Sequence, residues 1–375
     1  MAHAFEAAWA RSPAAAEAAG RHRQAQAQQR VADAWLADAP ALELAQRTGR
    51  GTAAEGSRER ELGVSLPLWR FGQRQQQAGL AQADADWATA GEQVARLRLA
   101  AQVREQAARL RLADIEATHA ARQRALLSKL SADVDRRVKA GDLAPADAMA
   151  AQAELLAARG LEQDAALALR TQHSEWAVLT GLTAAPEVEP APEPLEDAMP
   201  MNAEPRWAEA AVVRARAHLA QVQAQRGAPI ELGLGLRQER DGPGQPRENS
   251  VAVSLRLPFG TEAHSMPRLA EAGAELDVAL ANQQRVQQQL TAELALARDH
   301  LTARTHQVEA ETARAALLRT RAQLLEQAFH AGESALPELL RAFSAAAQAE
   351  SAAARQHAAL LQARARLLQA LGQLP

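Results

Sequence analysis

The stretch Ala140-Gly141-Asp142-Leu143-Ala144-Pro145 interrupts a long run of helical character, and Ala331-Gly332-Glu333-Ser334-Ala335-Leu336-Pro337 interrupts a second one. The two glycines lie 191 positions apart (332 minus 141). The same offset separates two further pairs of landmarks, Leu66-Pro67 from Leu257-Pro258 and Gly181 from Gly372. Three landmarks at one spacing predict that the chain consists of two copies of one structural unit.

The two repeats are predicted to occupy residues 1–182 and 206–375, with a connector at 183–205 between them. The connector is rich in proline and in acidic residues. Proline lacks a backbone donor and disfavours helix in the residue before it, so we expect an extended segment. It is either a flexible linker or an ordered strap along a helical body.

The composition favours long, closely packed helices. Hydrophobic residues make up 47% of the chain but aromatic residues only 3%, and alanine supplies much of the difference. Strong helix formers in this proportion are typical of helices packed side by side. The net charge of −3 argues against a nucleic-acid-binding protein. The absence of cysteine excludes disulfides, thiolate metal sites and a lipid-acceptor cysteine.

Short segments with a period of two predict strands in each repeat. In Glu231–Arg240 and Ser250–Leu257, apolar residues alternate with small or polar ones, and the glycine- and proline-rich segment Asp241–Asn249 joins them as a loop. In the first repeat a strand at Leu62–Leu66 follows a glycine-rich loop at Arg47–Glu59. An earlier strand around Leu42 and Leu44 is only weakly indicated.

Strands of nine or ten residues have the length of tilted membrane-spanning β-strands, for which roughly 9–11 residues are needed. The alternative is a soluble hairpin half-covered by helices. If the strands span a bilayer, their apolar residues face lipid: Leu62, Val64, Leu66, Leu232, Leu234, Leu236, Val251, Val253 and Leu255.

Each strand pair is followed by a long helix and a shorter returning one. From Gln73 to about Asp135 there is no proline, and a second long helix follows Met266-Pro267. Apolar residues recur at every seventh position, which predicts a coiled-coil seam: Leu80, Trp87, Val94, Ala101, Ala108 and Ile115, and Leu294, Leu301, Val308 and Ala315. Some sixty residues give a rod of about 90 Å. The returning helices are expected at about Pro145–Leu179 and Pro337–Leu371.

Four membrane strands cannot close a barrel, whose smallest common form has about eight. An open sheet edge in lipid leaves backbone groups unpaired at several kcal/mol each. If the strands span a bilayer, several chains must therefore share one barrel.

The chain resembles the TolC family of outer-membrane factors over about residues 5–372. The residues that carry the resemblance are the duplicated strand-ending proline, the long helix, the Arg-x-x-x-Gly tip and the closing leucine and glycine. The first tip runs from Arg137 to Asp147; in the second, Ala328 stands where the arginine would be. The amino-acid sequences of both tips are similar to those of the CzcC-like branch of the family, which serves heavy-metal efflux.

The resemblance implies a mainly α fold with a small β part: long antiparallel coiled-coil hairpins, and four strands per chain in a twelve-stranded barrel shared by a homotrimer. It implies an outer-membrane location with a periplasmic helical extension. The expected function is that of a passive exit duct for metal ions or small toxic compounds. The expected partners are outer-membrane lipid, a periplasmic adaptor (membrane fusion) protein and an inner-membrane resistance-nodulation-division pump.

The two tips have a structural and a functional interpretation, which are compatible. Gly141 and Gly332 permit a positive φ in the turn, and the acidic residues favour the N-terminus of the returning helix. By resemblance, the tips dock the hairpins of the adaptor. The candidate docking residues are Arg137, Gly141, Asp142, Leu143, Asp147, Gly332, Glu333, Leu336 and Glu338.

Nothing in the sequence predicts an enzyme, a cofactor or a metal site. His300 and His306 are six positions apart and so do not share a helix face. Residues 1–9 lack the basic and apolar pattern of a signal peptide, so we expect the signal upstream of the printed sequence. The alternative to a duct is a non-transporting or truncated helical scaffold of the same fold.

Overall fold

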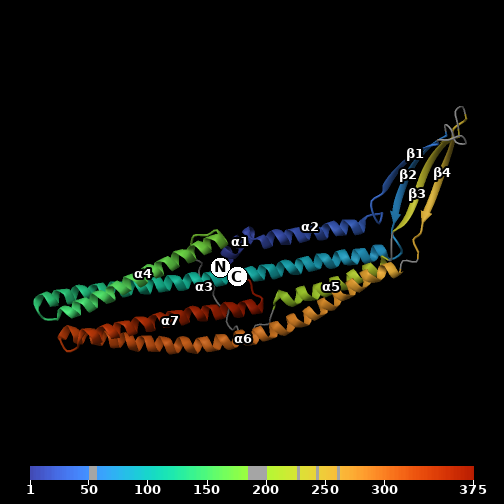
Figure 1. The fold of residues 1–375 in the computed structure, drawn as a ribbon. Coiled ribbons are helices and arrows are strands. Elements are labelled where there is room, and N and C mark those ends of the chain that lie inside the picture. Colours follow the sequence, from blue (N-terminus) through green and yellow to red (C-terminus); the bar gives the residue numbers. More distant parts are fainter. Residues whose placement is uncertain (50–56, 185–200, 226–228, 242–244, 260–261) are drawn as a thin grey trace. The chain divides into compact units, whose positions relative to one another are not determined.

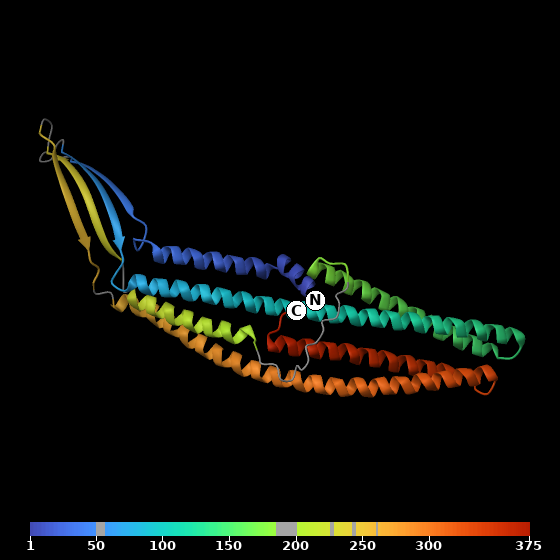
Figure 2. The same ribbon diagram turned by 180° about the vertical axis from the view of Figure 1, so that it is seen from behind.

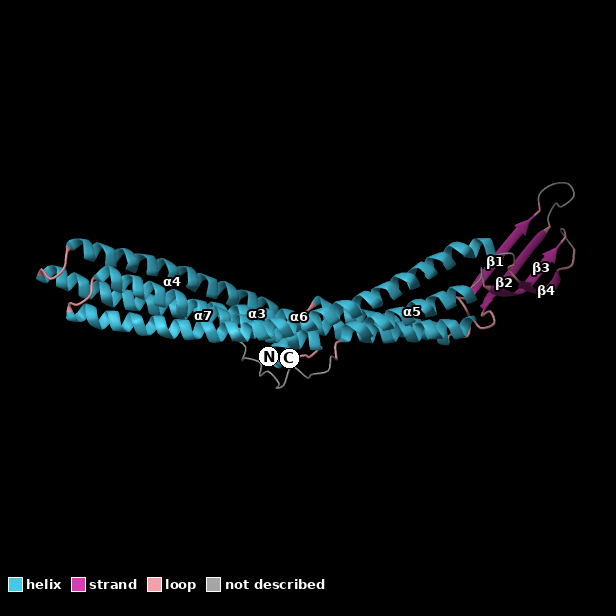
Figure 3. Cartoon of the chain, turned by 90° about the horizontal axis from the view of Figure 1, so that it is seen from below, coloured by secondary structure: helices cyan, strands magenta, loops and turns pink. Residues whose placement is uncertain are grey.

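The computed structural model describes residues 1–49, 57–184, 201–225, 229–241, 245–259 and 262–375. Its elements follow in this order: α1 (Ala2–Arg11), α2 (Pro13–Asp33), β1 (Ala41–Thr48), β2 (Arg58–Leu68), α3 (Gln73–Ala140), α4 (Pro145–Thr180), α5 (Ala203–Ala224), β3 (Ile230–Arg240), β4 (Glu248–Arg256), α6 (Glu262–Ala331) and α7 (Leu336–Leu371). After α1, each half of the chain contributes a helix, two strands, a long helix and a returning helix (Figure 3). Most of the predicted connector and parts of both predicted strand-joining loops lie outside the described residues.

The chain forms two compact units, and each takes segments from both halves. Unit 1 comprises residues 1–15, 93–203 and 288–375, and unit 2 comprises residues 16–92 and 204–287. Unit 2 contains the strands. Unit 1 contains both turns between a long helix and its returning helix, at Gly141 and Gly332.

The strands of unit 2 form one four-stranded antiparallel sheet in the order β1-β2-β3-β4 (Figure 1). The register places Leu62 between Leu44 and Leu236, and Val253 opposite Leu234. Since directly opposed residues in a sheet point to the same side, the apolar residues of all four strands share one face.

The strand predictions are largely confirmed, with two differences. The weakly indicated first strand is present as β1. The predicted end of the next strand at Pro67 is wrong, because β2 runs from Arg58 to Leu68 and Pro67 pairs with Glu231. Proline removes one donor, but a single missing bond at the end of a strand does not stop the pairing.

Helices α3 and α4 in unit 1 run side by side, as do α6 and α7 (Figure 2). Between α3 and α4, Nε and Nη2 of Arg124 donate to the two carboxylate oxygens of Glu162 at 2.9 and 3.1 Å. This pair raises the pKa of the Arg124 guanidinium above its ordinary value, because Glu162 accepts its hydrogen bonds and carries the opposite charge.

The predicted seam is confirmed for two of its four residues in α6 and is displaced by one position at the start of α3. Val308 and Ala315 in α6 are buried. Of the six predicted positions in α3, only Val94 is buried, whereas Ala81 and Ala88, one position further along, are almost inaccessible. Ala81 and Ala88 are themselves seven positions apart, so the start of α3 keeps the predicted spacing while its buried face is rotated by one residue.

The second long helix begins earlier than predicted. Helix α6 starts at Glu262 and contains Pro267. Pro267 is the sixth residue of the helix, beyond the first four N–H groups that have no intrahelical partner. It therefore removes one hydrogen bond near the start of α6, and the helix continues after it. None of the described helices is both long enough and apolar enough to cross a membrane.

The largest buried cluster of unit 1 lies next to the two turns. It combines residues of α3, α4, α6 and α7: Leu127, Leu130, Val134, Ala151, Leu155, Ala158, Ala322, Phe329, Leu336, Leu339, Ala342, Phe343 and Ala346. A second cluster surrounds Phe5 and Trp176 and joins α1 to α3 and α4. Both chain ends lie in unit 1 and close to each other (Figures 1 and 2).

Candidate functional site

The two helix turns of unit 1 have the same backbone geometry. Gly141 has φ 88° and Gly332 has φ 79°. The N–H of Asp142 donates to the carbonyl of Arg137 at 2.9 Å, and the N–H of Glu333 donates to the carbonyl of Ala328 at 2.8 Å. These bonds close a Schellman turn after a glycine in the left-handed region. The structural interpretation of both glycines is thereby confirmed.

The acidic residues of the first tip divide into one that caps the returning helix and one that faces solvent. Asp147 accepts the N–H of Ala144 on Oδ2 at 3.2 Å, so its carboxylate satisfies a donor just before α4. Ala144 has no side-chain acceptor to complete a reciprocal capping box. Asp142 is exposed, as is Glu333 at the second tip, and Glu338 lies in the first turn of α7. Negative charge therefore surrounds the N-termini of both returning helices.

Arg137 connects the two tips within unit 1. Its Nη2 donates to Nδ1 of His330 at 2.9 Å, and its Nη1 donates to the carbonyl of Phe329 at 3.3 Å. Its Nε lies 3.1 Å from Oδ2 of Asp133, and the guanidinium lies 5.0 Å from the centre of the Phe329 ring. Since arginine has no acceptor, Nδ1 of His330 must be the unprotonated ring nitrogen in this geometry.

The two leucines among the candidate docking residues occupy different environments. Leu143 is partly buried and packs against the cluster beside the turns. Leu336 is only 2% exposed and belongs to that cluster. Its side chain supports the turn from inside. Among the candidate docking residues, the exposed ones are Gly141, Asp142, Gly332, Glu333 and Glu338.

All of the predicted lipid-facing residues lie on one face of the sheet in unit 2, which we call the apolar face. It is formed by Leu42 and Leu44 of β1 with the nine predicted residues of β2, β3 and β4. Many of these side chains are open to solvent in the single chain: Val251 is 75% exposed, Val253 69% and Leu44 75%. A continuous surface of this kind marks contact with lipid or with another protein.

The opposite face of the sheet, which we call the charged face, carries small residues and ion pairs. Arg237 is at its centre, with Nε 3.0 Å from Oε1 of Glu59 and Nη2 3.1 Å from Oε2 of Glu239. Sequence reasoning did not find this network, although reading the alternate residues of each strand places Arg237 and the glutamates on the same face. Gly63 and Gly235 are direct partners in the register, and neither adds a side chain to the middle of this face.

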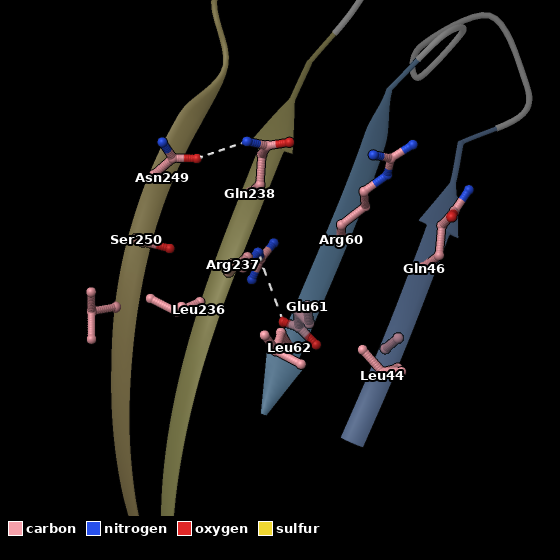
Figure 4. A pocket seen from close by; sticks show the side chains of 12 residues that line it. Leu44, Gln46, Arg60, Glu61, Leu62, Leu236, Arg237, Gln238, Asn249 and Ser250 are labelled. Atoms are coloured by element: carbon pink, nitrogen blue, oxygen red, sulfur yellow. Dashed lines mark hydrogen bonds and ion pairs between the residues drawn. The ribbon is translucent and has the colours of Figure 1, made fainter. Parts of the chain in front are cut away.

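The apolar face ends in a polar row near the strand-joining loops. Gln46, Arg60, Gln238 and Asn249 lie side by side across the four strands, and Nε2 of Gln238 donates to Oδ1 of Asn249 at 3.0 Å (Figure 4). The hollow in this region measures about 650 Å³, and both Glu61 and Leu62 line it. Because these neighbours point to opposite faces, the lining residues do not form one concave surface, and we do not assign a ligand site to the hollow.

Among the residues that the structure describes, no group of three or more His, Cys, Asp or Glu side chains could hold a metal ion. His306 in α6 is exposed and lies 3.7 Å from Glu309 on its own helix. His300 likewise belongs to no such group among the described residues.

Comparison with solved structures finds the same fold in outer-membrane proteins. The outer membrane protein VceC of Vibrio cholerae is 17% identical, with a TM-score of 0.81 over 99% of this chain and 95% of that chain. A membrane protein of Pseudomonas aeruginosa is 18% identical, with a TM-score of 0.80 over 99% of this chain and 89% of that one. The CmeC outer membrane channel of Campylobacter jejuni is 14% identical, with a TM-score of 0.79 over 98% and 84%.

No protein-family model matches the sequence, and no curated protein matches it either. The solved structures nevertheless agree with this chain over nearly its whole length. The predicted fold class is therefore confirmed: the chain is mainly helical, carries a small four-stranded antiparallel sheet and has a TolC-like fold.

Proposed function

We propose that this chain is one protomer of a passive outer-membrane exit duct. The observation that carries the proposal is the sheet of unit 2, whose apolar face is exposed while its charged face holds the glycines and ion pairs. In a bilayer, the first face would contact lipid and the second would line a water-filled lumen. The fold shared with outer-membrane proteins supports this assignment.

The open edges of the sheet support an oligomer. In the described part of the chain, β1 and β4 each pair with one neighbour, so each has an unpaired edge. Unpaired backbone groups in lipid cost several kcal/mol each, and pairing with the next protomer removes that cost. A homotrimer with four strands from each chain is the assembly that the resemblance implies.

The exposed residues of the two tips form the surface proposed for partner docking. Asp142, Glu333 and Glu338 give this surface negative charge. The partner that fits is the hairpin tip of a periplasmic adaptor with complementary charge, which would connect the duct to a resistance-nodulation-division pump. Arg137 of the first tip donates hydrogen bonds to His330 and to the Phe329 carbonyl, and these contacts connect it to the second tip.

The cargo proposed for the duct is metal ions or small toxic compounds, because the sequences of both tips resemble the CzcC-like branch. A passive duct needs no catalytic group, no cofactor and no tight cargo site. Heavy-metal resistance is therefore the phenotype to measure first in a cell whose own outer-membrane duct has been deleted.

The molecular mass in mild detergent, combined with insertion into liposomes, tests the proposal. The chain has a mass of 40.1 kDa, so a trimer should have a protein mass of 3 × 40.1, or about 120 kDa, and should remain in the membrane after a urea wash. A water-soluble, monodisperse monomer would refute the duct and support the helical scaffold instead.

A further inference from the structure

Charge is segregated between the two faces of the sheet in unit 2. Among the described strand residues, every glutamate lies on the charged face: Glu43, Glu59, Glu61, Glu231, Glu239 and Glu248. The charged residues of the described strands on the apolar face are Arg58, Arg60 and Arg240. We call these three arginines the arginine rim.

The arginine rim lies beyond one end of the apolar residues. The last apolar row across the sheet is Leu44, Leu62, Leu236 and Val251. Arg60 lies in the next row on the same face, between Gln46 and Gln238, and Arg58 and Arg240 lie one row further (Figure 4 shows Arg60). Successive rows on one face are about 6.7 Å apart, so Arg60 borders the apolar surface directly.

The rim places like charges together. Arg58 and Arg240 are direct partners in the β2–β3 register, and directly opposed like charges destabilise a sheet. On the charged face, Arg47 lies 3.8 Å from Glu59, and Arg237 lies 3.0 Å from the same carboxylate. For Arg58 and Arg60, the described strands place no carboxylate on the same face, and both side chains are exposed.

We propose that the arginine rim binds the phosphate groups of anionic lipids at the edge of the bilayer. The inference rests on the proposed insertion of the sheet into a membrane. With the apolar rows in the hydrocarbon, Arg60 has its aliphatic stem along the apolar surface and its guanidinium at the level of the lipid headgroups. A phosphate offers two or more acceptor oxygens to the planar guanidinium donors of Arg58 and Arg60.

The test compares lipid retention by three forms of the full chain in nanodiscs with equal amounts of phosphatidylglycerol and phosphatidylcholine. The forms are the unaltered protein, Arg58→Gln with Arg60→Gln, and the control Arg47→Gln with Arg256→Gln. Each double variant loses two positive charges, but Arg47 and Arg256 lie on the charged face. Native mass spectrometry measures the ratio of the two lipids that stay bound.

We expect phosphatidylglycerol to be enriched on the unaltered protein and on the control. The rim variant should lose this enrichment by roughly 25-fold, since each of its two lost basic residues near a headgroup layer contributes on the order of fivefold. Equal enrichment in all three forms would overturn the proposal, as would equal loss in both double variants.

Two further measurements keep the outcome unambiguous. Inorganic phosphate added before lipid should leave the enrichment in place; complete displacement would show that the rim binds free phosphate and would overturn the lipid assignment. Urea-resistant insertion is measured on the same samples. Failure of the unaltered protein to insert would refute the duct itself, whereas normal insertion without enrichment would refute only the rim.

Discussion

Glycine at each helix turn is required by backbone conformation and not by space. A Cβ built on Gly141 or on Gly332 would meet no heavy atom within 4 Å, but both residues have a positive φ. A side chain in this region costs about 1–2 kcal/mol. The turns therefore tolerate other residues sterically while their backbone energy still favours glycine.

Replacing Gly141 with alanine should lower the free energy of unfolding by about 1 kcal/mol, because alanine is strained at a positive φ. Gly160 in α4 is the matched control, since it is also exposed with nothing within 4 Å of its Cβ position, but lies inside a helix. Gly160→Ala should raise stability by about 0.5–1 kcal/mol. Urea denaturation followed by circular dichroism measures both, and equal effects would contradict the strain at Gly141.

Reversing the charge of both tips should reduce efflux without reducing the amount of assembled protein. In the variant Asp142→Lys with Glu333→Lys, two exposed carboxylates become cations, which would repel an adaptor that binds negative tips. Asp164→Lys with Glu309→Lys is the control, with two exposed acids on α4 and α6 away from the turns. Resistance to exported compounds and the level of membrane-inserted protein are measured in the same strains; unchanged resistance at normal levels would refute docking at the tips.

The two turns could be predicted at the residue scale, but the contacts between the tips could not. Glycine at equivalent positions of two repeats indicates the turn directly, because few other residues adopt that φ. The bond from Arg137 to His330 depends on how α3 packs beside α6, and the repeat gives no hint of it because Ala328 replaces the arginine. Leu336 was expected at the surface for the same reason: its position next to a turn says nothing about what packs over it.

At the element scale, the helices of unit 1 are held by one buried side and leave much of the other side open. Leu155 and Leu156 are neighbours on α4, but Leu155 is 5% exposed and Leu156 is 55% exposed. Leu155→Ala should cost about 2–5 kcal/mol of stability through lost burial and the cavity that remains. Leu156→Ala should cost less than about 1 kcal/mol. A similar loss of thermal stability in both variants would show that Leu156 is covered in the folded protein.

The two faces of β4 should respond differently to one substitution. Val253 lies on the apolar face, so an aspartate there would enter lipid at a cost of up to a few kcal/mol. Ser254 lies on the charged face beside Gly233, which has no side chain to compete for the space. Val253→Asp should abolish membrane assembly, and Ser254→Asp should preserve it. Membrane-inserted protein after a urea wash is the readout, and equal tolerance at both positions would contradict the lipid contact.

The strands were predictable from their alternation, because a period of two fixes which residues share a face whatever the rest of the fold does. The seam of α3 was not predictable at its start, because a seven-residue spacing fits Leu80 with Trp87 and Ala81 with Ala88 equally well, and the packing of the helix decides which pair is buried. Ala81 and Ala88 occupy the buried side where Leu80 and Trp87 were expected. Trp87 instead stacks on Trp207 of α5, with ring centres 6.1 Å apart.

At the scale of the whole molecule, a single chain leaves two kinds of surface incomplete. The described sheet has two open edges, and its apolar face is exposed. In the proposed duct, pairing between protomers would close the edges, and lipid would cover the apolar face. The charged face, with Arg237 and its glutamate partners, would then surround a path for water and ions.

Electrical recording across a planar lipid bilayer tests this account most directly. The detergent-purified oligomer should insert and produce discrete steps of equal conductance, while Val253→Asp, prepared in the same way, should produce none. Ser254→Asp should conduct, with a changed preference for cations because the new carboxylate faces the lumen. Two results would contradict the duct. One is a folded oligomer that inserts without producing conductance steps, and the other is a Val253→Asp variant whose conductance steps are as large as those of the unaltered protein.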